Sequence, residues 1–491
     1  MSGAELPAAS PRPELPPGPY LVAGIGRAGF AALDRLRGRG DEVSVWDGLL
    51  WPGPEQMLGR LRAEGVRTHA GGDGGRALAA EPRPRCVVKS PGIPFDQPLI
   101  AAAREAGVAV IDELELGWRL EPRPLVAVTG TNGKSTVSAL VEAILRAAGV
   151  EPLLAGNTNF GHPLSGVGDA PGEAVVCEVS SYQLEGCSAF IPEVGVLTNV
   201  SRDHLYRHRS LGEYERLKRS MFIRERACQA AALNADDALG APLARELLDR
   251  GTSVATFGFG AAARWRIEAC EPDGDRSRLA IGGPGGKVRL AARLPGRHNA
   301  ENVAAALAVA ELCAIDAPTA IDAVEGFAGL PGRFQRIRSP QAPEVVVDYA
   351  HNPAGVAGAL ETAREIAAAR GGRLTAVVSV LSIYDPELSA AIGAAAASGC
   401  DSLVVTAERM LVEEPREPSP ALVEAAEGGP ATLEVVPERR EAIAAALAAS
   451  GPRDLVAVLG RGDRDTPIFE SSGAVTTATD AELVAESLAD G

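Results

Sequence analysis

The sequence predicts an α/β protein of three domains: a Rossmann-like N-terminal domain, a central P-loop-type domain with a mainly parallel sheet, and a C-terminal Rossmann-like α/β domain. A chain of 491 residues is long enough for about three domains of ordinary size. Short apolar segments alternate with amphipathic ones almost throughout, which is typical of βαβ units. Proline- and glycine-containing breaks near residues 121–124 and 329–332 separate three such series. We therefore place the domains at 19–122, 123–330 and 331–491, after a tail at 1–18.

The elements follow in order along the chain. In the first domain we expect a strand at 20–24, a helix at 30–38, a strand at 42–46 and a later strand at 86–90 that ends in a turn at 91–94. The central domain begins with a strand at 125–129 and a helix at 137–148. Apolar runs predict the strands of the third domain, at 344–348, 374–380, 402–406 and 455–459.

Composition excludes several classes of partner. Lys and Arg (48) against Asp and Glu (64) give a net charge of −16, and no basic block interrupts that balance, which argues against nucleic acid. The alanine-rich stretches are short and broken by charges, so we expect no membrane segment. Seven scattered cysteines without a CxxC pair favour reduced thiols in a cytoplasmic protein. The tail at 1–18 is rich in Pro and Ala and predicts disorder, not a signal peptide.

The first glycine-rich loop is Gly24-Ile-Gly26-Arg27-Ala-Gly29, which lies between a strand and a helix. Its glycines allow a phosphate to approach the helix N-terminus, and Asp47 at the end of the next strand could accept hydrogen bonds from a ribose. Three interpretations stay open from these residues alone: a dinucleotide site, another nucleotide site, or a packing turn that binds nothing.

The second loop is more specific. Thr129-Gly-Thr-Asn-Gly-Lys-Ser-Thr136 follows an apolar strand and precedes a helix, so its backbone N–H groups can form a nest for phosphates. Lys134 would neutralise phosphate charge, and Ser135 or Thr136 would offer a hydroxyl to Mg²⁺. Only two residues separate Gly130 from Gly133, which is shorter than in the standard P-loop.

This compact loop resembles the ATP loop of the Mur ligase family, which builds the peptide of bacterial peptidoglycan, and of its folylpolyglutamate and cyanophycin synthetase relatives. Further segments are similar to family motifs in the same order: Gly156-Asn157, Glu178-Val-Ser-Ser-Tyr-Gln-Leu, Asn199-Val-Ser-Arg-Asp-His204 with His208 and Lys218 downstream, Gly296-Arg-His-Asn299-Ala-Glu-Asn302, Gly332-Arg333-Phe, and Asp348-Tyr-Ala-His-Asn-Pro353. The resemblance implies an ADP-forming, ATP- and Mg²⁺-dependent ligase that couples an amino acid to a carboxylate through an acyl phosphate.

The resemblance also implies roles for particular residues. ATP would contact the loop from Gly130 through Thr131, Asn132, Gly133, Lys134, Ser135 and Thr136, and also Asn299, Asn302, Arg333 and Asp348. The acceptor would contact Gly24, Gly26, Arg27, Asp47, Ser90, Gly92 and Asn157. Catalysis would rest on Lys134, Glu178, His204 and Lys218, and the metal would lie among Ser135, Glu178, His204 and Lys218. His208 could equally be a structural histidine.

Lys218 poses an electrostatic problem in a metal site. An ammonium about 4 Å from a divalent ion is repelled by roughly 8 kcal/mol at an effective dielectric constant near 20. In the family this lysine is carbamylated, which makes it anionic, so the resemblance predicts a carbamate at Lys218.

Within the family, the first two domains are most similar to the member that adds glutamate to UDP-N-acetylmuramoyl-L-alanine. We therefore expect that acceptor, D-glutamate as the amino acid, a monomer, and a role in cell-wall synthesis. The third domain departs from that member at Asp348–Pro353 and at 379–384, and Gly460-Arg-Gly-Asp-Arg-Asp465 is similar instead to the diaminopimelate or lysine ligases and cyanophycin synthetase. L-Glutamate, another amino acid, or a cyanophycin- or folylpolyglutamate-like reaction thus remain alternatives. A NAD-dependent oxidoreductase is a distant one, because it leaves the second loop unexplained.

Overall fold

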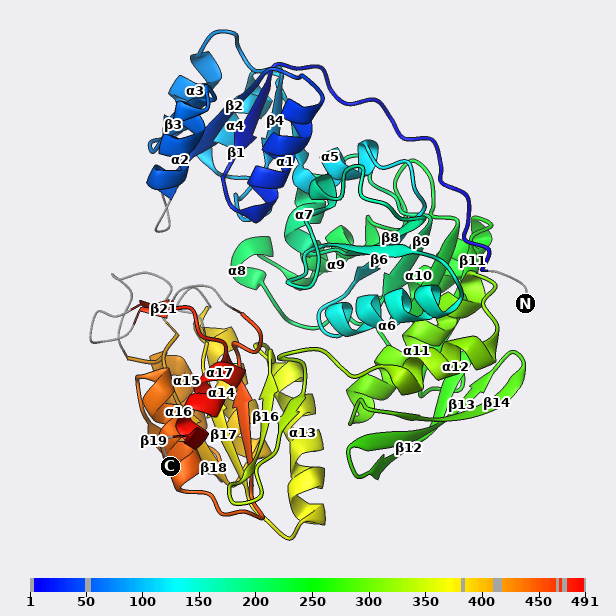
Figure 1. The fold of residues 1–491 in the computed structure, drawn as a ribbon, viewed down its shortest axis with the longest axis vertical. Coiled ribbons are helices and arrows are strands. Elements are labelled where there is room, and N and C mark those ends of the chain that lie inside the picture. The colour runs from blue at the N-terminus through cyan, green and yellow to red at the C-terminus, as the bar shows by residue number, and fades with distance from the viewer. Residues whose placement is uncertain are drawn as a thin grey trace.

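Three sheets organise the computed structural model, which describes residues 4–48, 54–380, 385–408, 417–464, 468–469 and 475–489 (Figure 1). The strands of the three sheets fall within 20–112, 125–292 and 335–459. The predicted class, an α/β protein of three mainly parallel units, is confirmed. Residues 381–384 and Asp465, which belong to segments discussed above, lie outside the described residues. No helix in the described part of the chain is long and apolar enough to cross a membrane.

The first sheet is parallel throughout and has Rossmann-like order. Its strands run β3 (Arg67–Ala70), β2 (Val43–Asp47), β1 (Tyr20–Ala23), β4 (Cys86–Lys89) and β5 (Ala109–Asp112). One face is buried by α1 (Arg27–Gly38), α2 (Pro54–Ala63) and α5 (Glu113–Arg119), and the other by α3 (Gly75–Ala79) and α4 (Pro98–Glu105). Helix α1 begins three residues earlier than its apolar pattern predicts, directly after the glycine-rich loop.

The central sheet combines parallel strands with an antiparallel extension. Its order is β14 (Gly286–Ala292), β13 (Arg276–Gly283), β12 (Trp265–Asp273), β11 (Ser253–Gly258), β10 (Ala230–Asn234), β9 (Val194–Leu197), β6 (Leu125–Thr129), β8 (Ala174–Glu178) and β7 (Pro152–Gly156). Strands β12 to β14 form the antiparallel part. Helices α6 (Lys134–Ala147), α11 (Arg297–Leu312) and α12 (Ala317–Gly326) bury one face; α7 (Ser181–Glu185), α9 (Leu211–Arg219) and α10 (Gly240–Asp249) lie on the other, with η1 (Leu164–Gly166).

The third sheet is parallel apart from one edge strand. Its order is β15 (Gln335–Ile337), β16 (Glu344–Asp348), β20 (Leu455–Leu459), β17 (Leu374–Val378), β18 (Ser402–Val405) and β19 (Thr432–Val435), with β15 antiparallel. Helices α13 (Pro353–Ala369), α14 (Pro386–Gly399) and α15 (Pro420–Glu427) cover one face, and α16 (Arg439–Ala448) and α17 (Asp480–Ala489) the other. A short hairpin, β21 (Ile468–Phe469) with β22 (Val475–Thr476), lies apart from this sheet.

The segment before β1 differs from the disordered tail that its composition predicts. It runs in extended form from the first sheet along the outside of the central one, as the dark-blue trace in Figure 1 shows. Arg12 places two guanidinium nitrogens 2.9 Å from the carboxylate oxygens of Glu193, whose side chain is fully buried. The same guanidinium donates to the carbonyl oxygens of Glu121 and Arg123, in the connection between the first two sheets. The segment before β1 is ordered because the buried Glu193 carboxylate needs a cation and Arg12 supplies it. Sequence patterns do not reveal this pairing.

Replacing Arg12 with Ala should destabilise the protein. The Glu193 carboxylate would stay buried without its cation, at a cost of about 3 kcal/mol, which should lower the unfolding midpoint in calorimetry by about 5 °C or more. The exposed pair of Arg37 with Glu64 provides the control, since Arg37→Ala should change stability by no more than about 0.5 kcal/mol. Equal midpoints for the two variants would show that the extended segment contributes nothing to stability.

Candidate active site

A cavity of about 900 Å³ is lined by residues from all three sheet units. It lies at the carboxyl ends of parallel strands, where open α/β sheets usually bind ligands. It gathers many of the predicted residues: Arg27, Gly130, Thr131, Asn132, Gly133, Lys134, Ser135, Thr136, Asn157, Glu178, His204, Lys218, Asn299, Asn302, Arg333 and Asp348. Residues predicted to act together, up to 321 positions apart in the chain (Arg27 and Asp348), therefore share one cavity.

The loop between β6 and α6 is packed so closely that its glycines have no room for a side chain. A Cβ on Gly130 would lie 1.8 Å from the hydroxyl of Thr198, and one on Gly133 would lie 2.2 Å from the side-chain oxygen of Asn302. Gly133 also has a φ of 85°, which favours glycine. The loop leads directly into the N-terminus of α6, where the first backbone N–H groups of a helix can bind phosphate.

Two lysines converge on the same backbone oxygen. The Nζ of Lys134 lies 3.2 Å from the carbonyl oxygen of Gly130, and the Nζ of Lys218 lies 2.6 Å from it. Burial lowers the pKa of Lys134, and burial together with repulsion from Lys134 holds the pKa of Lys218 well below its usual value. Lys218 is 1% exposed, so it does not belong to a solvated helix face. Its Nζ also lies 4.4 Å from the centre of the Tyr214 ring.

Glu178 and Ser135 form one group of candidate metal ligands. The Ser135 hydroxyl donates to Glu178 Oε2 at 2.7 Å, and the Asn157 amide lies 3.4 Å from Oε1. Glu178 ends β8 and Ser135 opens α6, so two neighbouring strands of the sheet bring the pair to the phosphate loop. Carboxylate and hydroxyl oxygens are ligands that Mg²⁺ prefers, so this pair fits a magnesium ion beside bound phosphates.

His204 belongs to a second group. A carboxylate oxygen of Asp203 and a ring nitrogen each of His204 and His351 lie within 4.8 Å of one another. Burial lowers the pKa of His204 to about 3 despite the neighbouring Asp203, so its imidazole is neutral near pH 7 and can donate a lone pair to a metal. His351 comes from the third sheet unit, after β16, and was not among the predicted site residues. His351 belongs to the Asp348–Pro353 motif, but the sequence alone does not show that its side chain lies close to Asp203.

His208 is a structural histidine in this arrangement. It is 1% exposed, its Nε2 lies 2.8 Å from the Ser181 hydroxyl, and its Nδ1 lies 3.3 Å from Glu185. It is absent from the described residues that line the cavity. Its partners therefore account for it without a ligand.

Asn299 and Asn302 line the cavity from the start of α11, and a hydrogen bond of 3.0 Å joins their side chains. Arg333 and Asp348 enter from the third unit. Arg333 pairs with Asp463 at 2.6 Å, and Asp348 accepts a hydrogen bond of 2.6 Å from the backbone N–H of Phe334. Burial raises the pKa of Asp348.

Most residues predicted to bind the acceptor in the first domain lie outside the cavity wall. Gly24, Gly26, Asp47, Ser90 and Gly92 are not among the described residues of the cavity wall, although Pro91 in the same turn is. Asp47 accepts a hydrogen bond of 2.9 Å from Ile25 N–H, and the Ser90 hydroxyl donates to Gly24 O at 2.9 Å. These bonds shape the first glycine-rich loop from within.

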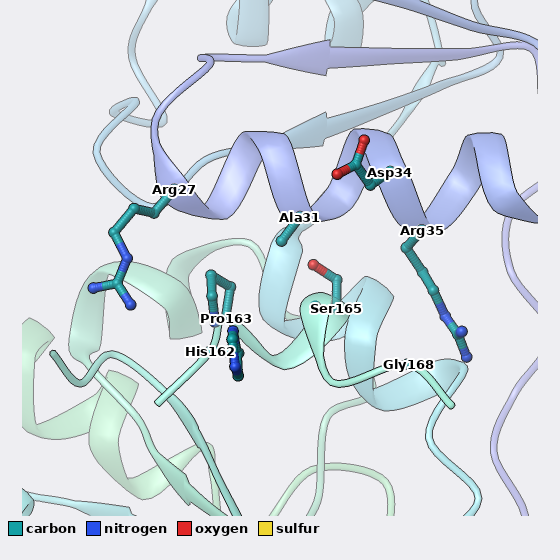
Figure 2. Close-up of a pocket in the computed structure, with 9 residues that line it drawn as sticks. Arg27, Ala31, Asp34, Arg35, His162, Pro163, Ser165 and Gly168 are labelled. Carbon is teal, nitrogen blue, oxygen red and sulfur yellow. The ribbon is translucent and has the colours of Figure 1, made fainter. Parts of the chain in front are cut away.

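Arg27 connects this loop to the central unit. Its guanidinium donates to the carbonyl oxygens of Thr158 (3.4 Å) and Gly161 (2.8 Å). Figure 2 shows Arg27 and Arg35 extending from α1 toward the segment with His162 and Ser165, around a second cavity of about 420 Å³. Arg27 lines both cavities.

Glu113 is a cavity residue that the sequence analysis did not single out. It is 1% exposed, and its Oε1 accepts hydrogen bonds from the backbone N–H (2.7 Å) and hydroxyl (2.6 Å) of Ser165. Burial raises its pKa to about 7. In sequence it reads as an ordinary acidic residue in the first turn of a helix, and no local signal distinguishes it.

Comparison with known proteins agrees with this geometry. Residues 128–310 match the family model of the Mur ligase middle domain, and residues 332–462 match that of the Mur ligase, glutamate ligase domain. The chain is 32% identical over 334 residues to the UDP-N-acetylmuramoylalanine–D-glutamate ligase of Gloeothece citriformis, covering 67% of this chain and 72% of that one. It is 34% identical over 367 residues to the enzyme of the same name from Geobacter metallireducens, covering 72% and 76%.

Solved structures share the fold. The UDP-N-acetylmuramate-alanine ligase of Thermotoga maritima superposes with a TM-score of 0.60 at 21% identity, over 91% of this chain and 96% of that one. A pseudomurein peptide ligase type C from Methanothermus fervidus gives a TM-score of 0.56 at 22% identity, over 90% and 97%.

The matches define the class of this protein: it is an ATP-dependent ligase that forms amide bonds. More particularly, the chain belongs to the Mur ligase family. The family uses ATP with Mg²⁺, and the phosphate loop and the Ser135–Glu178 pair fit those two ligands.

Proposed function

We propose that this protein adds D-glutamate to UDP-N-acetylmuramoyl-L-alanine, in the cytoplasm, with ATP as the source of energy. The main support for the proposal is that the phosphate loop, Glu178 and His204 line one cavity together with residues of the third unit. The relatives named for this reaction match over about two thirds of the chain or more, which supports the choice of substrates. We also propose domain borders at 122/123 and 330/331, supported by the residues that each sheet contains.

The chemistry begins with a carboxylate that is too poor an electrophile to react with an amine. Transfer of the γ-phosphoryl group of ATP to that carboxylate gives an acyl phosphate, whose phosphate the amine then displaces. Such a transfer needs position and charge neutralisation more than covalent help from the protein. Lys134 would supply positive charge at the phosphates from its place on α6, and Ser135 with Glu178 would hold Mg²⁺, which screens the phosphate oxygens when bound.

The remaining predicted residues receive roles by their position. Asn299 and Asn302 would contact the adenine end of ATP, and Arg333 and Asp348 would contact ATP from the third domain. Asn157, beside Glu178, would contact the acceptor near its reacting carboxylate.

The nucleotide half of the acceptor would bind at the first glycine-rich loop. A Cβ added to Gly26 would meet nothing within 4 Å, so the loop is open where a diphosphate would approach the N-terminus of α1. Gly24, Asp47, Ser90 and Gly92 would shape this site, and Arg27 would connect it to the cavity that holds the reacting carboxylate.

A panel of amino acids tests the proposed function. With ATP, Mg²⁺ and UDP-N-acetylmuramoyl-L-alanine, D-glutamate should support phosphate release with a kcat/KM at least about 100-fold above that of L-glutamate, D-aspartate or lysine, because a buried polar pocket strongly rejects wrong shapes. Omitting the acceptor should abolish release, and NADH absorbance should not change in any mixture. A preference for another amino acid, or release without the acceptor, would contradict the proposal.

We further propose that Lys218 acts as a carbamate. Its burial and lowered pKa support the proposal, because the neutral amine is the form that adds to CO₂, giving N–COO⁻ and releasing one proton. The resulting anion would lie beside Lys134 and the loop, and would offset the positive charge there.

Lys218→Ala should therefore be nearly inactive, and acetate should partly restore activity by standing in for the missing anion. Lys218→Arg should stay inactive with acetate, since its fixed cation occupies the space. Turnover is measured as phosphate release, and the modification by intact-protein mass. Full activity in CO₂-free buffer, with an unmodified lysine by mass, would refute the carbamate.

A further inference from the structure

Asn352 joins the third sheet unit to the phosphate loop. It is fully buried at the N-terminus of α13 and lies 220 positions from Asn132 of the loop. Its Nδ2 donates to the side-chain oxygen of Asn132 at 2.9 Å, and its Oδ1 accepts from the Asn132 amide at 3.1 Å. Two amides that pair in both directions fix distance and orientation more tightly than a single hydrogen bond does.

The central unit holds only the main chain of Asn132. Its carbonyl oxygen accepts from the Thr198 hydroxyl at 2.6 Å and from the Asn199 amide at 3.2 Å, and its N–H donates to Asn199 at 3.0 Å. Both described hydrogen bonds of the Asn132 side chain go to Asn352. The third unit therefore holds the Asn132 side chain, on the side of the loop that faces that unit.

The same Asn352 amide also reaches the second candidate metal group. Its Nδ2 lies 3.2 Å from Oδ2 of Asp203, whose Oδ1 accepts a hydrogen bond of 2.8 Å from the backbone N–H of His204. His204 has a φ of 54°, an uncommon left-handed conformation for a non-glycine residue that needs such support. One buried amide thus contacts both the phosphate loop and the carboxylate that holds His204.

We propose that Asn352 is a positioning residue, which fastens the third domain onto the ATP loop and braces His204 through Asp203. The proposal rests on the proposed function, in that the loop binds ATP. Phosphoryl transfer would then be efficient only when the third domain is seated, because the orientation of Asn132 and the support of His204 both depend on that domain. Seating would also bring Arg333 and the amino-acid side of the site to the phosphates before the acyl phosphate forms.

A simpler role for Asn352 is to cap α13, since its Oδ1 also accepts from Gly355 N–H at 2.9 Å. Asn352→Asp separates the two roles. Aspartate caps helices as well as asparagine does, so the helix should be unaffected. It has no amide to donate, however, and it sets a carboxylate about 3.2 Å from that of Asp203. If Asn352 only caps α13, the Asn352→Asp variant should keep its activity. If Asn352 positions the ATP loop, the variant should lose activity.

The experiment combines kinetics with amide hydrogen exchange on the full-length protein. For Asn352→Asp we expect kcat/KM for ATP to fall about tenfold to hundredfold, the usual effect of leaving buried polar groups unpaired. With a non-hydrolysable ATP analogue and Mg²⁺ alone, exchange of residues 130–136 should be at least about tenfold faster than in the wild type, while α13 keeps its protection. The matched control is Asp316→Asn at the N-cap of α12, which interchanges the same two residue types. It should change neither kcat/KM for ATP nor the exchange rate of the loop.

Two further variants keep the test decisive. Asn352→Ser retains a capping hydroxyl but cannot reach Asn132, and should also speed exchange of the loop, without the added charge. Combining Asn352→Asp with Asp203→Asn restores a donor opposite an acceptor only on the Asp203 side, and exchange of the loop should stay fast because the Asn132 oxygen still faces a carboxylate. Wild-type exchange of the loop in Asn352→Asp and Asn352→Ser, or full recovery of loop protection in the double variant, would overturn the proposal. The exchange measurement needs no acceptor, so an error in the assigned substrates would leave it intact.

Discussion

The convergence of two buried lysine amines on the carbonyl oxygen of Gly130 is the constraint on which the site depends. Burial removes hydration from both amines and lowers the pKa of each, and repulsion from Lys134 lowers the pKa of Lys218 further. The site therefore needs bound anions to keep these amines protonated, in a protein whose net charge of −16 would otherwise repel anions. Phosphates on one side and a carbamate on the other would satisfy this demand, and Glu178 is placed to share a metal ion with the phosphates.

The rest of the fold serves to bring groups from distant positions to those lysines. Parallel strands of the central sheet deliver Glu178 and the phosphate loop to one edge, and the third unit adds Arg333, Asp348 and Asn352 from the opposite side. The first unit is held by Arg27 and by the extended segment that contains the Arg12 ion pair. Amide-bond formation through an acyl phosphate requires three reactants within a few ångströms and the exclusion of water, which three units around one cavity can provide.

The features of the fold and site that could be predicted from the sequence are those that a short, continuous segment encodes. The phosphate loop was recognisable because strand, glycines, lysine and helix lie within a dozen residues, and the three α/β units followed from the alternation of apolar and amphipathic segments. The contact of Asn352 with Asn132 and the approach of His351 to Asp203 have no local signal, because they depend on how two units dock. The order of the N-terminal segment was missed for the same reason: an extended chain has no periodicity, and its stabilising partner, Glu193, lies 181 residues from Arg12.

The central claim is that the acceptor carboxylate attacks the γ-phosphoryl group of ATP at this cavity, and the fate of its oxygen tests that claim most directly. With an acceptor labelled with ¹⁸O in that carboxylate, each phosphate released with product should carry one labelled oxygen by mass spectrometry. Lys134→Ala should slow the release of labelled phosphate at least about 100-fold, because one preorganised positive group is lost from the transition state. Unlabelled phosphate from the wild-type protein, with all ¹⁸O retained in acceptor and product, would contradict the account.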